Sequence, residues 1–239
     1  MMSPPSSNGD LRADATFIVD PVRCRPALSC FLKFWAERGP SARALLGRIS
    51  DLDSELARGT DPTAVHRHYC QLLAGVPESC IEEHGRQWAE LMAATSPLFS
   101  SLRRAARAPL RGSAGVHLVS DTLGGVAVAL MRELGADTVI STRAVVDDRG
   151  RLTGEIAGPV VKGGQDGTLR QFADARHLDL SQSRAWGICF GDLPVLESVG
   201  YPGVVDPDPS LRSIAHAEGW PVAVSAELTQ TVNGARSRG

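Results

Sequence analysis

Three side chains able to do chemistry follow short apolar runs that are typical of buried strands. Asp20, Ser120 and Cys189 each occupy the last position of such a run. A carboxyl can exchange a proton, a hydroxyl can donate or accept a hydrogen bond, and a thiolate can attack an electrophile. We therefore take these three positions as the first candidates for a reactive site.

The elements that would carry these residues alternate between strand and helix from Gly115 onward. The apolar periodicity predicts strands over 116–120, 136–142, 183–189 and 203–206, a hairpin over 145–156, helices over 125–135, 168–178, 193–200 and 210–219, and a last edge segment after residue 219. This alternation predicts an α/β fold with a parallel sheet covered on both faces. Ligands bind at the carboxyl ends of parallel strands, so the three candidates should meet at one edge.

A first strand is predicted over 15–20, and from about Ala27 to Arg107 the chain has a helical pattern throughout. We expect an α/β core made of residues 13–26 and 110–225, interrupted by an all-helical cap over 27–109. Residues 1–12 and 226–239 are rich in small and polar residues, and we expect a disordered N-terminus and a flexible tail there.

Composition excludes several classes of protein. Apolar residues make up 43% of the 239 residues and charged residues 22%, which is ordinary for a globular domain. The formal charge of −2 and the lack of a basic block predict no nucleic-acid partner. No apolar run is long enough to span a bilayer and no signal pattern opens the chain, so we expect a cytoplasmic protein with no membrane partner.

The five cysteines are odd in number and form no C-x-x-C pair. We interpret them as free thiols in a reducing compartment. The histidines show no zinc-binding spacing, so we expect no metal and no cofactor.

Three segments carry a resemblance to a known family. They are GRLTGEI, GDLPVLESVG and VDPDPSLRSIAHAEGWPV. Together they resemble the haloacid dehalogenase superfamily, and more narrowly its phosphoserine-phosphatase-like branch (subfamily IB), over residues 15–224. The resemblance implies a Rossmann-like parallel sheet with a C1-type helical cap inserted after the first strand. It also implies phosphoryl transfer with Mg²⁺ through four motifs.

The first motif of that family, F-D-x-D-G-T, supplies an aspartate nucleophile and, two residues later, an acid/base aspartate. Aligned on Phe17, the chain carries Ile18 at the nucleophile position and Asp20 at the acid/base position. An isoleucine side chain cannot attack phosphorus. In a shifted register Asp20 is the nucleophile and Val22 occupies the acid/base position, which breaks the motif elsewhere.

The residue expected in motif II is present, whereas the lysine expected in motif III is replaced. Ser120 fits the hydroxyl position of motif II, although a residue of this type also caps helices. Gln165 stands where the lysine of motif III is expected, and Lys162 on the preceding glycine-rich loop is a candidate substitute.

Motif IV, G-D-S-x-x-D, appears as the sequence GICFGD. Ile188 replaces the first aspartate, Cys189 replaces the serine, and Asp192 keeps the last position. Mg²⁺ requires a shell of hard oxygen ligands. The losses therefore predict very weak Mg²⁺ binding and no conventional phosphatase.

Two interpretations remain, with a residual phosphatase as a third. In the first, the pocket serves a metal-independent small-molecule enzyme, and in the second the chain is a pseudoenzyme that binds a partner without turnover. For the enzyme, burial should raise the pKa of Asp20 and make it a general acid or base, Cys189 is a candidate nucleophile, and the chemistry would be acid/base, elimination or cyclisation. The candidate catalytic residues are Asp20, Cys189 and Asp192, and the candidate substrate-binding residues are Ser120, Asp121, Lys162, Arg23, Ile18 and Ile188.

The expected partner is a small-molecule substrate or ligand, and the sequence leaves a homodimer open. The chain has only two lysines, Lys33 and Lys162, among many Arg, Ala and Gly residues. Such usage is typical of GC-rich bacteria, whose biosynthetic pathways recruit proteins of this kind.

Overall fold

A computed structural model describes residues 13–22, 26–39, 42–106, 115–158, 160–161 and 167–225. The disorder expected for 1–12 and 226–239, and the candidates Arg23 and Lys162, lie outside the described residues.

The described strands form one seven-stranded sheet in the order β4-β3-β2-β1-β5-β6-β7. All neighbours are parallel except β3 and β4, which form the expected antiparallel hairpin. The fold is therefore the predicted α/β fold. The strands are β1 (Thr16–Val19), β2 (Val116–Leu123), β3 (Thr138–Val146), β4 (Leu152–Ala157), β5 (Arg184–Gly187), β6 (Tyr201–Val205) and β7 (Val222–Ala223).

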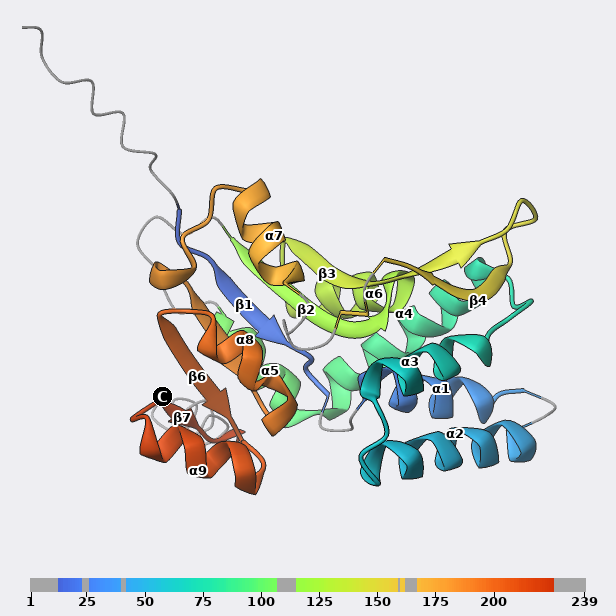
Figure 1. Cartoon of the computed structure of the whole chain (residues 1–239), viewed down its shortest axis with the longest axis horizontal. Helices are drawn as coiled ribbons and strands as arrows, with labels where there is room; N and C mark the ends of the chain where they lie inside the picture. The colour runs from blue at the N-terminus through green and yellow to red at the C-terminus, as the bar shows by residue number, and fades with distance from the viewer. Residues whose placement is uncertain are drawn as a thin grey trace, which may run out of the picture.

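Helices cover both faces of this sheet (Figure 1). One face packs against α7, α8 and α9, and the other against α5 and α6. The helices and 3₁₀ turns of the described chain are α1 (Ala27–Ala36), α2 (Ala42–Ala57), α3 (Pro62–Gln71), α4 (Glu78–Thr95), α5 (Pro97–Ala106), α6 (Gly124–Leu134), α7 (Thr168–Ala175), η1 (Leu180–Gln182), η2 (Phe190–Asp192), α8 (Leu193–Glu197) and α9 (Pro209–Ala217).

The central strand β1 is buried on both faces, which its continuous apolar sequence requires. Phe17 and Val19 belong to the cluster under α7 to α9, whereas Ile18 belongs to the cluster that contains the cap helices. Burial on both sides leaves only the carboxyl end of β1 open to chemistry.

Helices α1 to α5 fill the long connection between β1 and β2. The first three lie to one side of the sheet, below the β3–β4 hairpin in Figure 1. Helix α5 packs against β1, β5 and β6. The expected cap, 27–109, therefore includes one helix that lies on the sheet.

The cap is held closely to the core at two places. On α4, a Cβ added to Gly85 would lie 3.1 Å from Val126 Cα of α6, so only glycine permits this approach. At the hairpin, Gly75 N–H donates to Leu152 O at 2.7 Å and Leu152 N–H donates to Val76 O at 2.9 Å. These contacts fix the cap over the strand ends.

One cysteine corrects the expectation of five free thiols. Cys30 is disulfide-bonded, whereas Cys70, Cys80 and Cys189 are free. The cysteines therefore give no support to a reducing compartment. Within the described ranges, no helix is both long enough and apolar enough to cross a membrane.

Candidate functional site

Asp20 and Ser120 lie side by side at the carboxyl ends of β1 and β2. Val19 and Val119 are the last paired residues of the two strands, and Asp20 N–H continues the ladder by donating to Val119 O at 3.0 Å. Asp20 has a φ of +21°, which is unusual for a residue with a side chain. The chain therefore turns sharply where the carboxyl is presented.

The carboxylate of Asp20 is only 2% exposed and contacts the next residue of β2. Its Oδ2 accepts a hydrogen bond from Asp121 N–H at 3.2 Å. Asp121 in turn accepts from Leu28 N–H of α1 at 3.2 Å through Oδ1. Pro26, the N-cap of α1, makes no side-chain cap bond, so Asp121 supplies the acceptor that this helix end needs.

Ser120 is buried and its hydroxyl is engaged locally. It lies 2.8 Å from Thr122 Oγ1 and accepts from Thr122 N–H at 3.1 Å. The structure thus brings Asp20, Ser120 and Asp121 together at one edge of the sheet. The hydroxyl of Ser120 supports the end of β2 rather than a following helix.

The loop after β5 is organised by Asp192. Its carboxylate is fully buried, and Oδ2 accepts from Ile188 N–H at 2.7 Å and from Cys189 N–H at 3.0 Å. The Cys189 side chain accepts from the Asp192 N–H and completes a reciprocal cap of η2. Asp192 therefore shapes this loop, and Cys189 is a half-buried free thiol within it.

Comparison with known proteins identifies the family. A family model described as "haloacid dehalogenase-like hydrolase" matches residues 22–196, more than half of the chain. The chain belongs to this family. It is 32% identical over 173 residues to a phosphoserine phosphatase of Halobacterium salinarum, which covers 71% of this chain and 72% of that protein. This relative places it in the phosphoserine-phosphatase-like branch of the haloacid dehalogenase superfamily.

Two further similar proteins align with different shares of this chain. The chain is 39% identical over 107 residues to the "Inhibition of morphological differentiation protein" of Streptomyces azureus, over 45% of this chain and 39% of that protein. The chain spans between 32% and 39% of the length of the first curated relatives that it matches. A structure of a Bordetella pertussis protein of unknown function shares the fold, with a TM-score of 0.70, 23% identity and coverage of 89% and 98%.

In this haloacid dehalogenase-like chain, the two candidate nucleophile positions differ in their place relative to β1. Ile18 lies inside the strand, opposite Leu118 and Trp186, and is fully buried. Asp20 is the residue that follows the strand. Motif I of the family lies at the end of the first strand, so the shifted register, with Asp20 at the nucleophile position, fits the geometry better than the register on Ile18.

The Mg²⁺ of the family does not fit the residues at the motif positions. Ile188 is 3% exposed and shares an apolar cluster with Ile18 and Val22. Two motif carboxylates remain: Asp20 accepts the Asp121 amide, and Asp192 accepts two backbone amides through Oδ2. Mg²⁺ needs several oxygen ligands in near-octahedral geometry, which this set does not supply. Among the residues that the structure describes, no group of three or more His, Cys, Asp or Glu could hold a metal.

A polar cluster in the cap lies close enough to Asp121 to feel its charge, and it was not among the residues predicted from the sequence. Tyr69 OH donates to Asp53 Oδ1 at 2.5 Å, and Lys33 Nζ donates to Asp53 Oδ2 at 2.5 Å. Ser29 is fully buried beside them; it influences the pKa values of Asp53 and Tyr69 although its hydroxyl lacks hydrogen-bond geometry. Three cap helices meet in this cluster.

Electrostatics connects this cap cluster to the core. Burial would raise the pKa of Asp53, but the hydrogen bonds from Lys33 and Tyr69, the nearby Ser29 hydroxyl and the Lys33 charge outweigh it and lower that pKa. Burial, the bond to Asp53 and the nearby carboxylate of Asp121 all raise the pKa of Tyr69. The cluster therefore holds one carboxylate ionised and one phenol neutral near the strand end. The only sign of this cluster in the sequence is that Ser29 and Lys33 are four residues apart and so lie on one face of a helix.

A cavity of about 220 Å³ lies near the end of β2, between α4, α6 and the β3–β4 hairpin. Its lining includes Glu82, Leu123 and Arg143. None of the residues proposed from the sequence lines this cavity.

Proposed function

We propose that this chain is a small-molecule enzyme that uses Asp20 as its acid/base group and does not need a metal. Its substrate binds between the strand ends and the cap, and its chemistry is proton transfer, elimination or cyclisation within a bacterial biosynthetic pathway. Ser120 and Asp121 support the site, and Asp192 positions the loop that carries Cys189. Lys162 and Arg23 are proposed to receive an anionic group of the substrate.

The burial of the Asp20 carboxyl at the strand edge carries this proposal. A carboxyl that is 2% exposed exchanges protons with a bound ligand rather than with bulk water. Its one described amide contact, from Asp121, orients Oδ2. A cap tied to the core by backbone hydrogen bonds favours a water-poor site, in which such chemistry is efficient.

The side chains at the remaining motif positions argue against the phosphoryl transfer of the family. Val22 at the acid/base position of the shifted register cannot exchange a proton, and Ile188 cannot bind a cation. Both side chains belong to one apolar cluster. Asp20 therefore stands without the groups that would complete a phosphatase.

A residual phosphatase is the second candidate, and one observation favours it. Asp20 follows β1 directly, where the family has its nucleophile, and a relative at 32% identity is a phosphoserine phosphatase. In this candidate the carboxylate of Asp20 attacks phosphorus and displaces the alcohol of a phosphomonoester, and water then hydrolyses the aspartyl-phosphate to inorganic phosphate.

The test is untargeted mass spectrometry of a cell extract incubated with the wild-type chain, with Asp20→Asn, or with Asp148→Asn. Asp148 is exposed in the hairpin turn and serves as a matched control. We expect one ion to change with wild type and with Asp148→Asn but not with Asp20→Asn, without added Mg²⁺. Release of inorganic phosphate that depends on both Mg²⁺ and Asp20 would instead establish the residual phosphatase. If no ion changes, the pseudoenzyme interpretation replaces both.

A further inference from the structure

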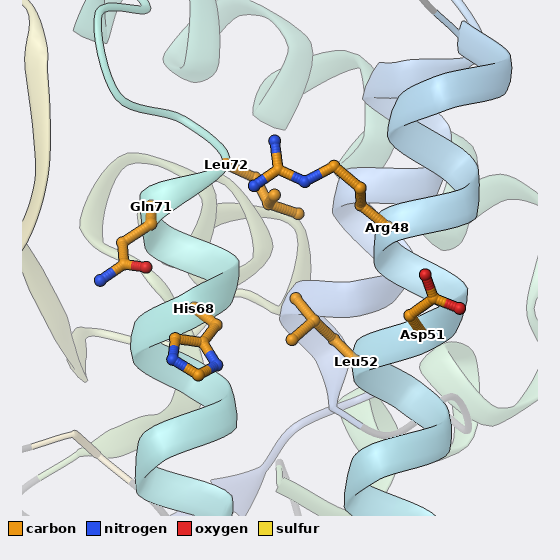
Figure 2. Close-up of a pocket in the computed structure, with 6 residues that line it drawn as sticks. All are labelled: Arg48, Asp51, Leu52, His68, Gln71 and Leu72. Atoms are coloured by element: carbon orange, nitrogen blue, oxygen red, sulfur yellow. The ribbon is translucent and has the colours of Figure 1, made fainter.

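A second cavity lies on the outer side of the cap, between α2 and α3. It measures about 300 Å³, and side chains from both helices border it (Figure 2). Leu52 and Leu72 provide apolar surface from opposite helices. The polar lining consists of Arg48, Asp51, His68 and Gln71. None of these residues belongs to the strand-edge site, so the inference does not rest on the proposed function.

The polar side chains of this groove are not committed to partners. Across the described ranges, the side chains of Arg48, Asp51, His68 and Gln71 take part in no hydrogen bond or ion pair. Arg48 reaches from α2 across toward Leu72 of α3 in Figure 2. A cation, an anion and two further polar groups therefore border one hollow that also contains two leucines.

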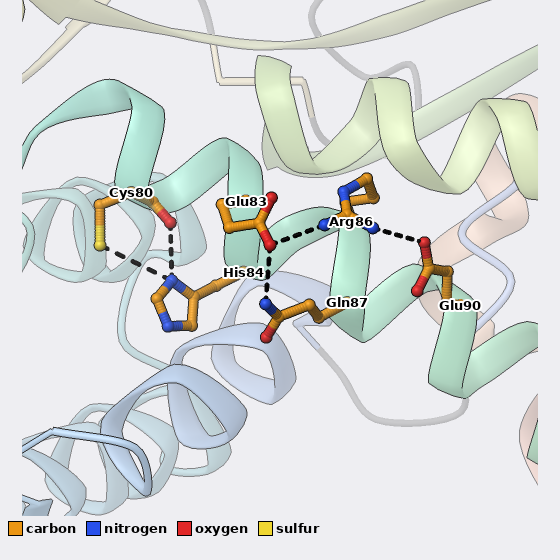
Figure 3. Close-up of polar contacts among 6 residues, drawn as sticks. All are labelled: Cys80, Glu83, His84, Arg86, Gln87 and Glu90. Atoms are coloured by element: carbon orange, nitrogen blue, oxygen red, sulfur yellow. Dashed lines mark hydrogen bonds and ion pairs between the residues drawn. The ribbon is translucent and has the colours of Figure 1, made fainter.

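The surface of α4 shows how exposed charges behave elsewhere in the cap. Arg86 binds Glu83 at 2.6 Å and Glu90 at 2.8 Å, and Gln87 joins the same network (Figure 3). Hydrogen bonds from Arg86 and Gln87 lower the pKa of Glu83. Arg48 and Asp51 have the same three-residue spacing as Glu83 and Arg86 but do not pair. Their order is reversed, and the helix dipole disfavours that order.

We propose that the groove binds a small aliphatic α-amino acid. Arg48 receives the carboxylate and Asp51 the ammonium group, while the aliphatic side chain lies on Leu52 and Leu72. Gln71 and His68 hydrogen-bond the remaining oxygen. Ligand cavities start at about 300 Å³, so a cavity of this size accepts an amino acid. A zwitterion matches this lining because Arg48 and Asp51 carry opposite charges one helical turn apart on α2.

The test is isothermal titration calorimetry of the full chain with L-leucine. The two half-ligands are 4-methylpentanoate, which lacks the ammonium group, and 3-methylbutylamine, which lacks the carboxylate. We expect L-leucine to bind and each half-ligand to bind at least about tenfold more weakly, because one ionic contact is lost. Arg48→Ala and Asp51→Asn should each weaken leucine binding by about tenfold or more.

Arg86→Ala is the matched control, since it removes an exposed arginine from the same cap. It should leave leucine binding unchanged, and thermal unfolding should show that all three variants fold. The proposal is overturned if L-leucine does not bind. It is also overturned if a half-ligand binds as well as leucine, or if Arg48→Ala binds leucine like the wild type.

Discussion

The carboxylate of Asp20 accepts the backbone N–H of Asp121 at 3.2 Å, which joins the ends of β1 and β2. The side chain of Asp121 then accepts Leu28 N–H of α1. One short chain of hydrogen bonds thus runs from the candidate acid/base group to the first turn of the cap. The position of the cap over the strand ends is therefore coupled to Asp20.

Asp121→Ala should lower the free energy of unfolding by about 1–2 kcal/mol, because α1 loses the acceptor at its N-terminus. Urea unfolding measures this value, and hydrogen exchange at the Leu28 amide should accelerate. Asp148→Ala, at an exposed turn, should leave both unchanged. Unaltered exchange at Leu28 in Asp121→Ala would show that Asp121 does not cap α1 in solution.

Asp192→Ala should lower the free energy of unfolding by about 3 kcal/mol, because it leaves the amides of Ile188 and Cys189 buried without an acceptor. Asp192→Asn keeps an oxygen in place and should cost less. Chemical denaturation of both variants measures the difference. A loss of turnover in Asp192→Ala at unchanged stability would instead assign Asp192 to the chemistry.

Gly200→Ala should destabilise the fold strongly, because the added Cβ would lie 1.7 Å from the backbone oxygen of Ser181 and the backbone must move. Gly47→Ala is the matched substitution, since nothing lies within 4 Å of its Cβ. In the interior of α2 it should raise stability by about 0.5–1 kcal/mol. Thermal melts compare the two, and equal melting temperatures would contradict the close approach at Gly200.

The protein should lose stability as the pH falls, because His117 is buried in its neutral form. Burial lowers its pKa from 6.5 to about 4, with Arg176 adding to this shift and Asp137 opposing it. Between pH 6.5 and 4 the unfolded chain takes up this proton and the folded chain does not. Stability is therefore fully present above pH 6.5 and is lost as the pH falls toward 4, by up to about 1.4 kcal/mol per pH unit.

The check for His117 is urea unfolding at several pH values between 4 and 6.5. The variant His117→Asn keeps a polar atom near Thr138, the hydrogen-bond partner of Nδ1, but does not titrate. It should show a shallower acid slope than the wild type. An identical slope in both proteins would assign the acid sensitivity to other groups.

Thiol titration tests the disulfide at Cys30. In the unfolded, unreduced protein we expect three reactive thiols, those of Cys70, Cys80 and Cys189. Reduction should raise the count to the five cysteines of the sequence. Five thiols before reduction would show that the bond is absent in solution and would agree with the proposed cytoplasmic location.

Within the candidate site, the sequence predicted which strand ends meet but not what each side chain does there. The apolar runs before Asp20, Ser120 and Cys189 indicated buried parallel strands, and the carboxyl ends of such strands share one edge. Asp192 was predicted to be catalytic, yet its carboxylate holds two amides of its own loop. Sequence spacing does not reveal this, because backbone amides carry no sequence signal.

The sequence by itself determined the α/β architecture, the helical insertion and the apolar residues at the motif positions, because these depend on local periodicity and residue type. Only the tertiary structure decided that Asp20 binds the Asp121 amide, that Asp121 caps α1, and that Asp53 joins three cap helices. Each of these contacts joins segments far apart in the chain or depends on where a strand stops. Such contacts depend on packing geometry, which no local pattern specifies.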